Sequence, residues 1–435
     1  MLHYYSLQHT APRVDFRTAT IQGQAPDGGL YFPESIPQLP ASILNNLAGL
    51  SREALAYEVI RPFVGDTIPE DELRRIVAET IDFPIPLKQV YDGVYSLELF
   101  HGPTLAFKDI GARFMSRCLG YFARDEKQPI TVLVATSGDT GGAVASGFHN
   151  VEGVRVVILY PSGKVSSVQE KQLTTFGDNI HALEVDGNFD DCQQLVKRAF
   201  KDAELTSQLF LTSANSINVA RWLPQQFYYF FALQQWKEKQ PPVFSVPSGN
   251  FGNICAGMMA WKAGLPVRHF IAACNANDVV PRFLETGDYE PRKAIPTISN
   301  AMDVGDPSNF VRILELFGKD RDQLKTMLSS YRTSDQRTRE LIRSMYQQHA
   351  YLPDPHGAVG FDALADWIGQ HPGQKGIVLE TAHPIKFLDV VEPVIGQPVP
   401  VPASIEETLT KTKNATQIEV DYSKMKDYLV NSNPF

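Results

Sequence analysis

From about residue 129 onward, short runs of β-branched and other apolar residues alternate with amphipathic helical patterns. This alternation is typical of βαβ units, which build parallel sheets covered by helices. It breaks between about residues 205 and 241, so we predict two α/β lobes. The predicted buried strands are ITVLVA (130–135), VRVVILY (154–160), NIHALEV (179–185), PVFSVP (242–247), VRHFIAAC (267–274) and GIVLET (376–381).

The chain outside this alternation has a different texture. Residues 25–40 read APDGGLYFPESIPQLP, which is rich in turn signals, and helical patterns follow at 52–64 and 69–80. We therefore predict a small, mainly helical N-terminal region, and we expect the proline-rich and then polar tail to be peripheral. The predicted divisions are 1–95 for the N-terminal region, 96–215 and 216–396 for the two lobes, and 397–435 for the tail.

Composition narrows the classes of function. The 435 residues carry a net charge of −9, with no long basic run, so we expect neither nucleic acid nor a membrane as a partner. The four cysteines show no CxxC spacing and the ten histidines no HxxxH pattern. We therefore expect no metal site and only structural histidines. The N-terminus lacks a basic segment followed by an apolar run, so we expect no signal peptide and a cytoplasmic protein.

A glycine-rich turn follows the strand at 242–247. Open α/β sheets bind ligands beyond the carboxyl ends of their strands, so residues at such positions are candidates for a site. The turn reads SGNFGNICAG, and Gly249 and Gly252 allow close approach of the backbone. Successive N–H groups and the start of the next helix would then face a phosphate. An ordinary tight turn uses the same residue types and is the alternative.

A second loop of this kind, TSGDTGGAVASGF at 136–148, follows the strand at 130–135. The hydroxyl groups of Thr136, Ser137 and Thr140 suit a carboxylate or a phosphate. Asp139 would repel such an anion. It could instead accept hydrogen bonds from the N–H groups of its own loop as a turn or cap residue.

Two further segments carry candidate residues. In NSINVAR (215–221), Asn218 and Arg221 are spaced to share one face of a helix, where Arg221 could bind a phosphate or pair with a surface carboxylate. Thr381 ends the buried strand at 376–381 and precedes AHPIKF.

One lysine lies among apolar residues. In ELFHGPTLAFKDIGARF (98–114), the run 105–107 leads to Lys108, which we place in the first turn of a helix. A helix N-terminus disfavours a cation and apolar surroundings disfavour the ammonium form, so both would lower the pKa of Lys108 from about 10.4. A lysine of this kind suits Schiff-base chemistry. The alternative is a surface lysine that covers apolar area.

Together these motifs resemble those of the threonine synthase family, in its longer branch, within the fold type II enzymes that use pyridoxal 5′-phosphate. That resemblance implies the cofactor and an α/β fold of the tryptophan synthase β kind, with two open, mostly parallel lobes and a small helical N-terminal region. The matching segments run in family order from residue 27 to 387: DGGLYFP, ELFHGPTLAFKDIGARF, ATSGDTGGAVA, YPSGKVSSVQEKQ, NSINVAR, VPSGNFGNICAG, NAMDVGDPSN and TAHPIKF.

The resemblance also implies roles for single residues. Lys108 would be the catalytic lysine that forms the imine with the cofactor, and Thr381 would face the pyridine nitrogen. The cofactor phosphate would be held by Gly249, Asn250, Phe251, Gly252 and Asn253. The α-carboxylate of the substrate would lie at Thr136, Ser137, Gly138 and Thr140, and its phosphate at Lys164, Asn218 and Arg221.

Asp139 departs from the wider pattern of fold type II. Relatives often carry asparagine at this position and use it on the 3′-oxygen of the cofactor. The aspartate of this chain is assigned to the cofactor site, but its contact there stays open.

The implied reaction converts O-phospho-L-homoserine and water to L-threonine and phosphate, which makes the chain a lyase of threonine biosynthesis. We expect the chain to act as a monomer or a homodimer. Another reaction on the same scaffold, such as dehydration of serine or threonine, is one alternative, and it would need no second phosphate site. A non-catalytic relative that binds phosphorylated ligands is the other, and the intact Lys108 argues against it.

The assignment of Lys108 leads to a direct labelling test. Borohydride reduction of the holoenzyme should fix the cofactor to the peptide that contains Lys108, and Lys108→Ala should lose at least about 10²-fold in turnover, as expected for removal of a general base. Peptide mapping by mass spectrometry checks the first result. Cofactor found on a different lysine would sink the assignment.

Overall fold

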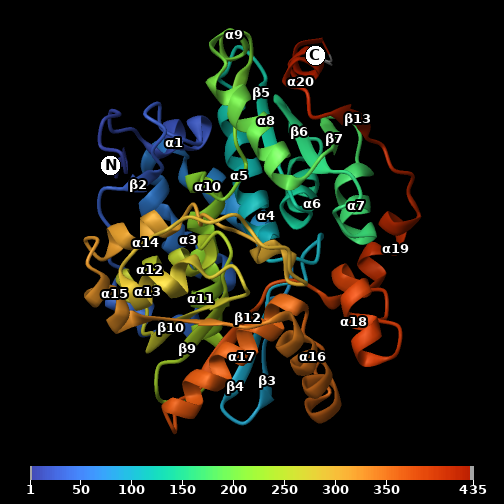
Figure 1. Ribbon diagram of the computed structural model, residues 1–435. Coiled ribbons are helices and arrows are strands. Elements are labelled where there is room, and N and C mark those ends of the chain that lie inside the picture. Colours follow the sequence, from blue (N-terminus) through green and yellow to red (C-terminus); the bar gives the residue numbers. More distant parts are fainter. Residues whose placement is uncertain (1, 432–435) are drawn as a thin grey trace.

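The computed structural model describes residues 2–431 and contains two larger sheets (Figure 1). One has five strands in the order β13 (Thr416–Glu419), β7 (Ile180–Asp186), β6 (Val154–Pro161), β5 (Ile130–Ala135) and β8 (Phe210–Thr212). The other has six strands in the order β11 (Leu328–Arg332), β10 (His269–Cys274), β9 (Val243–Pro247), β12 (Gly376–Glu380), β4 (Val94–Glu98) and β3 (Leu87–Tyr91).

All neighbouring strands in these two sheets are parallel except the antiparallel pair β3–β4. Strands β5 and β6 are buried along their whole length, which explains why their sequences are continuous apolar runs rather than alternating ones. Two open, mostly parallel α/β lobes were predicted from the sequence, and this fold class is confirmed.

Helices cover both sheets, and the N-terminal region is largely helical (Figure 1). That region contains α1 (Phe16–Gln22), α2 (Ala41–Leu44), η1 (Leu47–Gly49), α3 (Arg52–Val64), η2 (Gly65–Thr67) and α4 (Glu70–Thr80), with the short antiparallel pair β1 (Tyr4–Ser6) and β2 (Tyr31–Pro33). The five-stranded lobe contains α5 (Lys108–Ala123), α6 (Asp139–Phe148), α7 (Ser167–Thr174), α8 (Phe189–Lys201) and α9 (Ala203–Gln208).

The remaining helices follow β8. The six-stranded lobe contains α10 (Val219–Trp222), η3 (Leu223–Gln225), α11 (Gln226–Gln235), α12 (Gly252–Lys262), α13 (Val279–Thr286), η4 (Asn300–Met302), α14 (Phe310–Leu316), α15 (Arg321–Met327), α16 (Asp335–His349), α17 (Pro355–Gln370), η5 (Pro384–Phe387) and α18 (Leu388–Ile395). The tail contains α19 (Ala403–Thr410) and α20 (Tyr422–Asn431). Within residues 2–431, no helix combines the length and the apolar character needed to cross a bilayer.

The six strands and both N-terminal helices predicted from the sequence are confirmed, within one or two residues at each end. The helical stretch that contains Arg221 is divided into α10, η3 and α11, because Pro224 lies at the start of η3. The divisions predicted at 95, 215 and 396 stay predictions, but β3 and β4, next to the first of them, pair within the later, six-stranded sheet.

The tail contributes more than the peripheral segment expected from its composition. Strand β13 extends the edge of the five-stranded sheet, and Figure 1 shows α20 beside the same lobe. Three apolar side chains of α20, those of Tyr422, Met425 and Leu429, are buried in a cluster with residues of β6 and β7. The apolar face of α20 is spaced at three and four residues, which the polar composition of the tail concealed.

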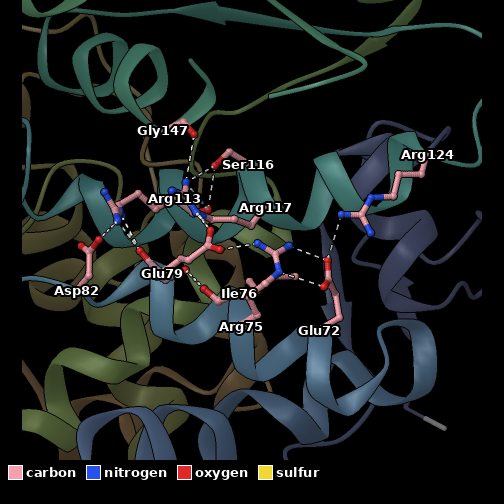
Figure 2. Close-up of polar contacts among 11 residues, drawn as sticks. Glu72, Arg75, Ile76, Glu79, Asp82, Arg113, Ser116, Arg117, Arg124 and Gly147 are labelled. Atoms are coloured by element: carbon pink, nitrogen blue, oxygen red, sulfur yellow. Dashed lines mark hydrogen bonds and ion pairs between the residues drawn. The ribbon is translucent and has the colours of Figure 1, made fainter. Parts of the chain in front are cut away.

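Helix α5 begins with Lys108 and is tied to the N-terminal region by a network of charged groups (Figure 2). Arg113 donates to the backbone oxygen of Glu79 and to the carboxylate of Asp82. Arg117 pairs with the Glu79 carboxylate at 3.2 Å and also donates to the Gly147 oxygen of α6, at 3.2 Å. The N-terminal region therefore holds α5, which carries Lys108, and α5 in turn binds α6, which carries Asp139.

The opposite side of α5 packs very closely on α10. A Cβ atom at Gly111 would lie 2.4 Å from the backbone oxygen of Arg221, a distance that real Cβ contacts do not reach. Glycine is therefore required at this position by the approach of the two backbones. Because Arg221 lines the cavity described below, this contact also fixes the distance between the Lys108 helix and the Arg221 helix.

Gly111→Ala is expected to destabilise the protein by about 1–3 kcal/mol, the usual range for overpacking a close contact. The midpoint of thermal unfolding should fall accordingly. Gly369→Ala in α17 is the matched control, because a Cβ atom there would meet nothing within 4 Å. Equal effects of the two substitutions would contradict the role given to the α5–α10 contact.

Candidate active site

A cavity of about 700 Å³ is lined by residues that follow the carboxyl ends of strands in both lobes. Thr136 follows β5, Ser248 follows β9 and Thr381 follows β12, while Lys108 reaches the same cavity from the start of α5. This is where open α/β sheets place ligands, and the volume suits a cofactor together with a small substrate.

Backbone contacts between two distant segments position Lys108. The N–H of Phe107 donates to the Thr381 oxygen at 2.8 Å, and the N–H of His383 donates to the Leu105 oxygen at 3.0 Å. An isolated antiparallel bridge joins Ala106 to Ala382 between them. The segment before Lys108 is thus paired with the segment after β12, which brings Lys108 and Thr381 to the same wall.

Two side chains complete this turn. Asp109 is buried in the first turn of α5 and accepts from the N–H of Thr104 at 3.0 Å and from its hydroxyl at 2.5 Å. A Cβ atom at Gly102 would lie 2.4 Å from a carboxylate oxygen of Asp109, so the turn requires glycine there. The HGPTLAFKD sequence is therefore a locally determined turn that starts α5.

Burial lowers the pKa of the Lys108 ammonium to about 8. The Asp139 carboxylate acts in the opposite direction, and the charges of Lys386 and Arg221 lower the pKa further. The sequence predicted a lowered pKa from two causes, apolar surroundings and the helix N-terminus. The first is the largest cause in the structure.

Asp139 lies between two lysines. One carboxylate oxygen is 2.8 Å from the Nζ atom of Lys386 and accepts from Gln169 at 2.9 Å, while the other is 4.0 Å from the Nζ atom of Lys108. Burial alone would raise the pKa of Asp139, but the charges of Lys386 and Lys108 hold it well below its usual range. The carboxylate therefore bonds to Lys386 and Gln169 rather than to the N–H groups of its own loop.

The turn after β9 forms an open cradle. No side chain within residues 2–431 caps the N-terminus of α12, and Phe251 stands just before it with a positive φ of 59°. The side-chain Nδ2 atom of Asn253 is buried on the cavity wall without a hydrogen-bond partner among the described residues. Gly249 is needed for close packing, because a Cβ atom there would lie 2.8 Å from the Ala301 oxygen.

The hydroxyl groups of the loop after β5 have different roles. The hydroxyl oxygen of Thr136 accepts from the N–H groups of Gly138 and Gly141, at 3.0 and 2.8 Å, so it stabilises the loop itself. Thr136, Ser137 and Thr140 line the cavity, whereas Gly138 is not part of its wall. Gly138 has a φ of 133°, a conformation that L-residues with a side chain rarely adopt.

The three residues assigned to the substrate phosphate are placed differently. Arg221 and Lys164 line the cavity. Arg221 donates to the Ala214 oxygen at 2.6 Å, its Nε atom is buried without a partner among the described residues, and burial lowers its pKa to about 10. Asn218 lies off the cavity wall, where it caps α10 and donates to the Thr20 oxygen.

Two residues, one on the cavity wall and one behind it, had no role in the sequence interpretation. His356 lines the cavity, although all histidines were expected to be structural. Its Nε2 atom accepts from the N–H of Ala301 at 3.1 Å and its Nδ1 atom lies 2.5 Å from Asp354, so the proton is assigned to Nδ1. Lys386 was contained in TAHPIKF but given no function. The sequence DPH at the start of a helix could have marked His356, because Asp354 is the N-cap residue of α17 and His356 follows it by two positions.

Family models match almost the whole chain. They are described as a pyridoxal-phosphate dependent enzyme at residues 86–380, the threonine synthase N terminus at 3–81 and the threonine synthase C-terminal part at 357–429. Threonine synthase from Serratia marcescens is 45% identical over 403 residues, which is 92% of either chain. The chain belongs to the threonine synthase family.

Solved structures of this family agree with that assignment. Threonine synthase from Escherichia coli has a TM-score of 0.93 and 41% identity, covering 99% of this chain and 100% of that one. Pyridoxal-phosphate-bound threonine synthase from Brucella melitensis has a TM-score of 0.92 and 35% identity, with both chains fully covered. The cofactor predicted from the sequence, pyridoxal 5′-phosphate, is confirmed for the family.

The residues present fit this cofactor. The uncapped start of α12 and the unpaired side-chain amide of Asn253 offer N–H donors to its phosphate, and Lys108 offers an amine in the same cavity. Thr381 also lines the cavity, where its hydroxyl can donate to a pyridine nitrogen. The individual contacts of these residues with the cofactor stay predictions.

Asn253→Asp tests the cradle. The substitution removes the unpaired N–H donor and adds a negative charge, so the affinity for pyridoxal 5′-phosphate should fall at least about tenfold, as loss of a hydrogen bond to a charged group implies. The stability of the cofactor-free protein should not fall, because a helix N-terminus favours a carboxylate. Fluorescence titration and thermal unfolding measure the two effects. Unchanged affinity in a folded variant would place the cofactor phosphate elsewhere.

Proposed function

We propose that this chain converts O-phospho-L-homoserine and water to L-threonine and phosphate, as a pyridoxal-phosphate-dependent lyase of threonine biosynthesis. The observation that carries the proposal is a single cavity that contains a lysine of lowered pKa and two groups of residues whose chemistry suits anions. One region is the cradle at α12, and the other consists of the β5 loop with Arg221 and Lys164.

Lys108 acts as the base at the Cα atom of the substrate. With a pKa of about 8, about a tenth of its amine is unprotonated at pH 7, far more than for a lysine of ordinary pKa, which suits proton transfer in both directions. When bound, the cofactor supplies an electron sink for the charge that develops at Cα. Lys108 takes that proton and later returns it to the same carbon.

The substrate has two anionic groups, and we assign them to different residues of this second region. Ser137, Thr140 and the N-terminal turn of α6 receive the α-carboxylate, while Arg221 and Lys164 receive the phosphate that leaves Cγ. This arrangement orients the Cα–H bond toward Lys108 and stabilises the departing phosphate. Loss of phosphate from Cγ also requires loss of a proton from Cβ. After the phosphate has left, Cγ gains a proton and becomes the methyl group, and water adds its hydroxyl group at Cβ.

A reaction without a phosphorylated substrate is the main alternative. Maize serine racemase shares the fold, with a TM-score of 0.55 and 18% identity over 72% of this chain, so the fold alone does not choose the substrate. Formation of threonine and phosphate in equal amounts from phosphohomoserine, with little ammonia from serine or threonine, would support the proposal. The reverse preference would refute it.

Cytoplasmic location, and action as a monomer or homodimer, remain part of the proposal. All four cysteines are buried free thiols, which fits a reducing compartment. Size-exclusion chromatography with light scattering would decide the oligomeric state.

Arg221→Ala should raise KM for phosphohomoserine about tenfold or more, because a hydrogen bond to a charged group contributes about 1.5–3 kcal/mol. Cofactor content should stay normal, since the proposal gives Arg221 to the substrate phosphate. Steady-state kinetics and the absorbance of bound cofactor measure the two quantities. Loss of cofactor with KM unaffected would show that Arg221 serves the other anion or the fold.

A further inference from the structure

Lys386 is a lysine whose side chain has no exposed surface, and it is outside the cavity wall. Its Nζ atom is 2.8 Å from a carboxylate oxygen of Asp139 and donates to the backbone oxygen of Thr104 at 2.8 Å. Thr104 belongs to the turn that starts α5, and Asp139 faces Lys108. A fully buried ammonium group is unusual unless it is paired, so its position at this junction requires an explanation.

The charged groups around Lys108 come from several elements. Asp139 of α6 is the anion beside it, and the charges of Lys386 of η5 and Arg221 of α10 disfavour its ammonium form. Asp109 of α5 is turned away from Lys108 and bonds to Thr104. Asp139 is therefore a single buried carboxylate shared between two ammonium groups, with the shorter contact to Lys386.

We propose that Lys386 is a positioning residue for Lys108: by holding the Asp139 carboxylate, it prevents Asp139 from stabilising the ammonium form of Lys108 as a full ion-pair partner. Two charges act together in this arrangement. Lys386 repels a proton on Lys108 directly, and it also neutralises the one carboxylate that would attract that proton. Without Lys386, Asp139 and Lys108 would form an isolated buried pair, and Lys108 would hold its proton more tightly.

The proposal rests on the function proposed above only for its purpose, because the base at Cα must be able to lose a proton. Its test needs no turnover. In the cofactor-free protein, the rate at which trace acetic anhydride acetylates Lys108 can be followed across pH 6–11 by mass spectrometry of its peptide. That profile gives the pKa of the Lys108 amine directly, so a failure of this proposal is separate from a failure of the proposed reaction.

Substitutions at the two partners should move the profile in opposite directions. Lys386→Met should raise the pKa of Lys108 by about one unit or more, and Asp139→Asn should lower it by a similar amount, as removal of a like or an opposite charge at these distances implies. If Lys386 had a merely structural role, Lys386→Met would leave the pKa of Lys108 unchanged or lower it. Either of those results overturns the proposal.

Lys386→Met leaves Asp139 with a single cationic partner and could fail to fold. In that event Lys386→Gln takes its place, because the amide keeps an N–H donor for Asp139 and Thr104 but removes the charge, and it should likewise raise the Lys108 pKa. Lys413→Met is the matched control, because Lys413 pairs with Glu170 and Glu184 at 2.7 Å each and should leave the Lys108 profile unchanged. An unchanged or lowered Lys108 pKa in Lys386→Gln contradicts the proposal.

Discussion

The active site depends on the antiparallel contact between residues 105–107 and residues 381–383. Two backbone hydrogen bonds and one bridge join these segments, which are about 275 positions apart in the sequence. The base and the side chain proposed for the pyridine nitrogen are therefore positioned by the backbone rather than by flexible side chains. Because residues 381–383 follow β12, the six-stranded sheet fixes where the lysine of α5 lies.

In this position, burial disfavours the ammonium form of Lys108. A pKa that falls from 10.5 to about 8 corresponds to roughly 3 kcal/mol against the ammonium form. The surrounding structure withstands it because α5 is tightly held: Arg113 and Arg117 bind it to α4 and α6, and Gly111 allows α10 to pack against it. Contacts between the N-terminal region and α5 thus compensate for the unfavourable burial of Lys108.

Local patterns were sufficient to predict much of this fold. Continuous apolar runs identified the buried parallel strands, and glycine-rich turns identified the loops beside the cavity. Where individual side chains lie relative to the cavity was harder to predict from the sequence. Asn218 and Arg221 have helical spacing, yet only Arg221 lines the cavity, because the side chain of Asn218 is used to cap α10. Lys386 and His356 were missed because their partners, Asp139 and Ala301, are remote in sequence.

The most direct measurement of the proposed reaction follows the oxygen of water. Turnover of phosphohomoserine in water enriched in oxygen-18 should place the label in the hydroxyl group of threonine and leave the released phosphate unlabelled, because the C–O bond at Cγ breaks and water adds at Cβ. Mass spectrometry of both products reads the result. Label in the phosphate, with homoserine as the other product, would show attack of water at phosphorus and would contradict the role given to Lys108.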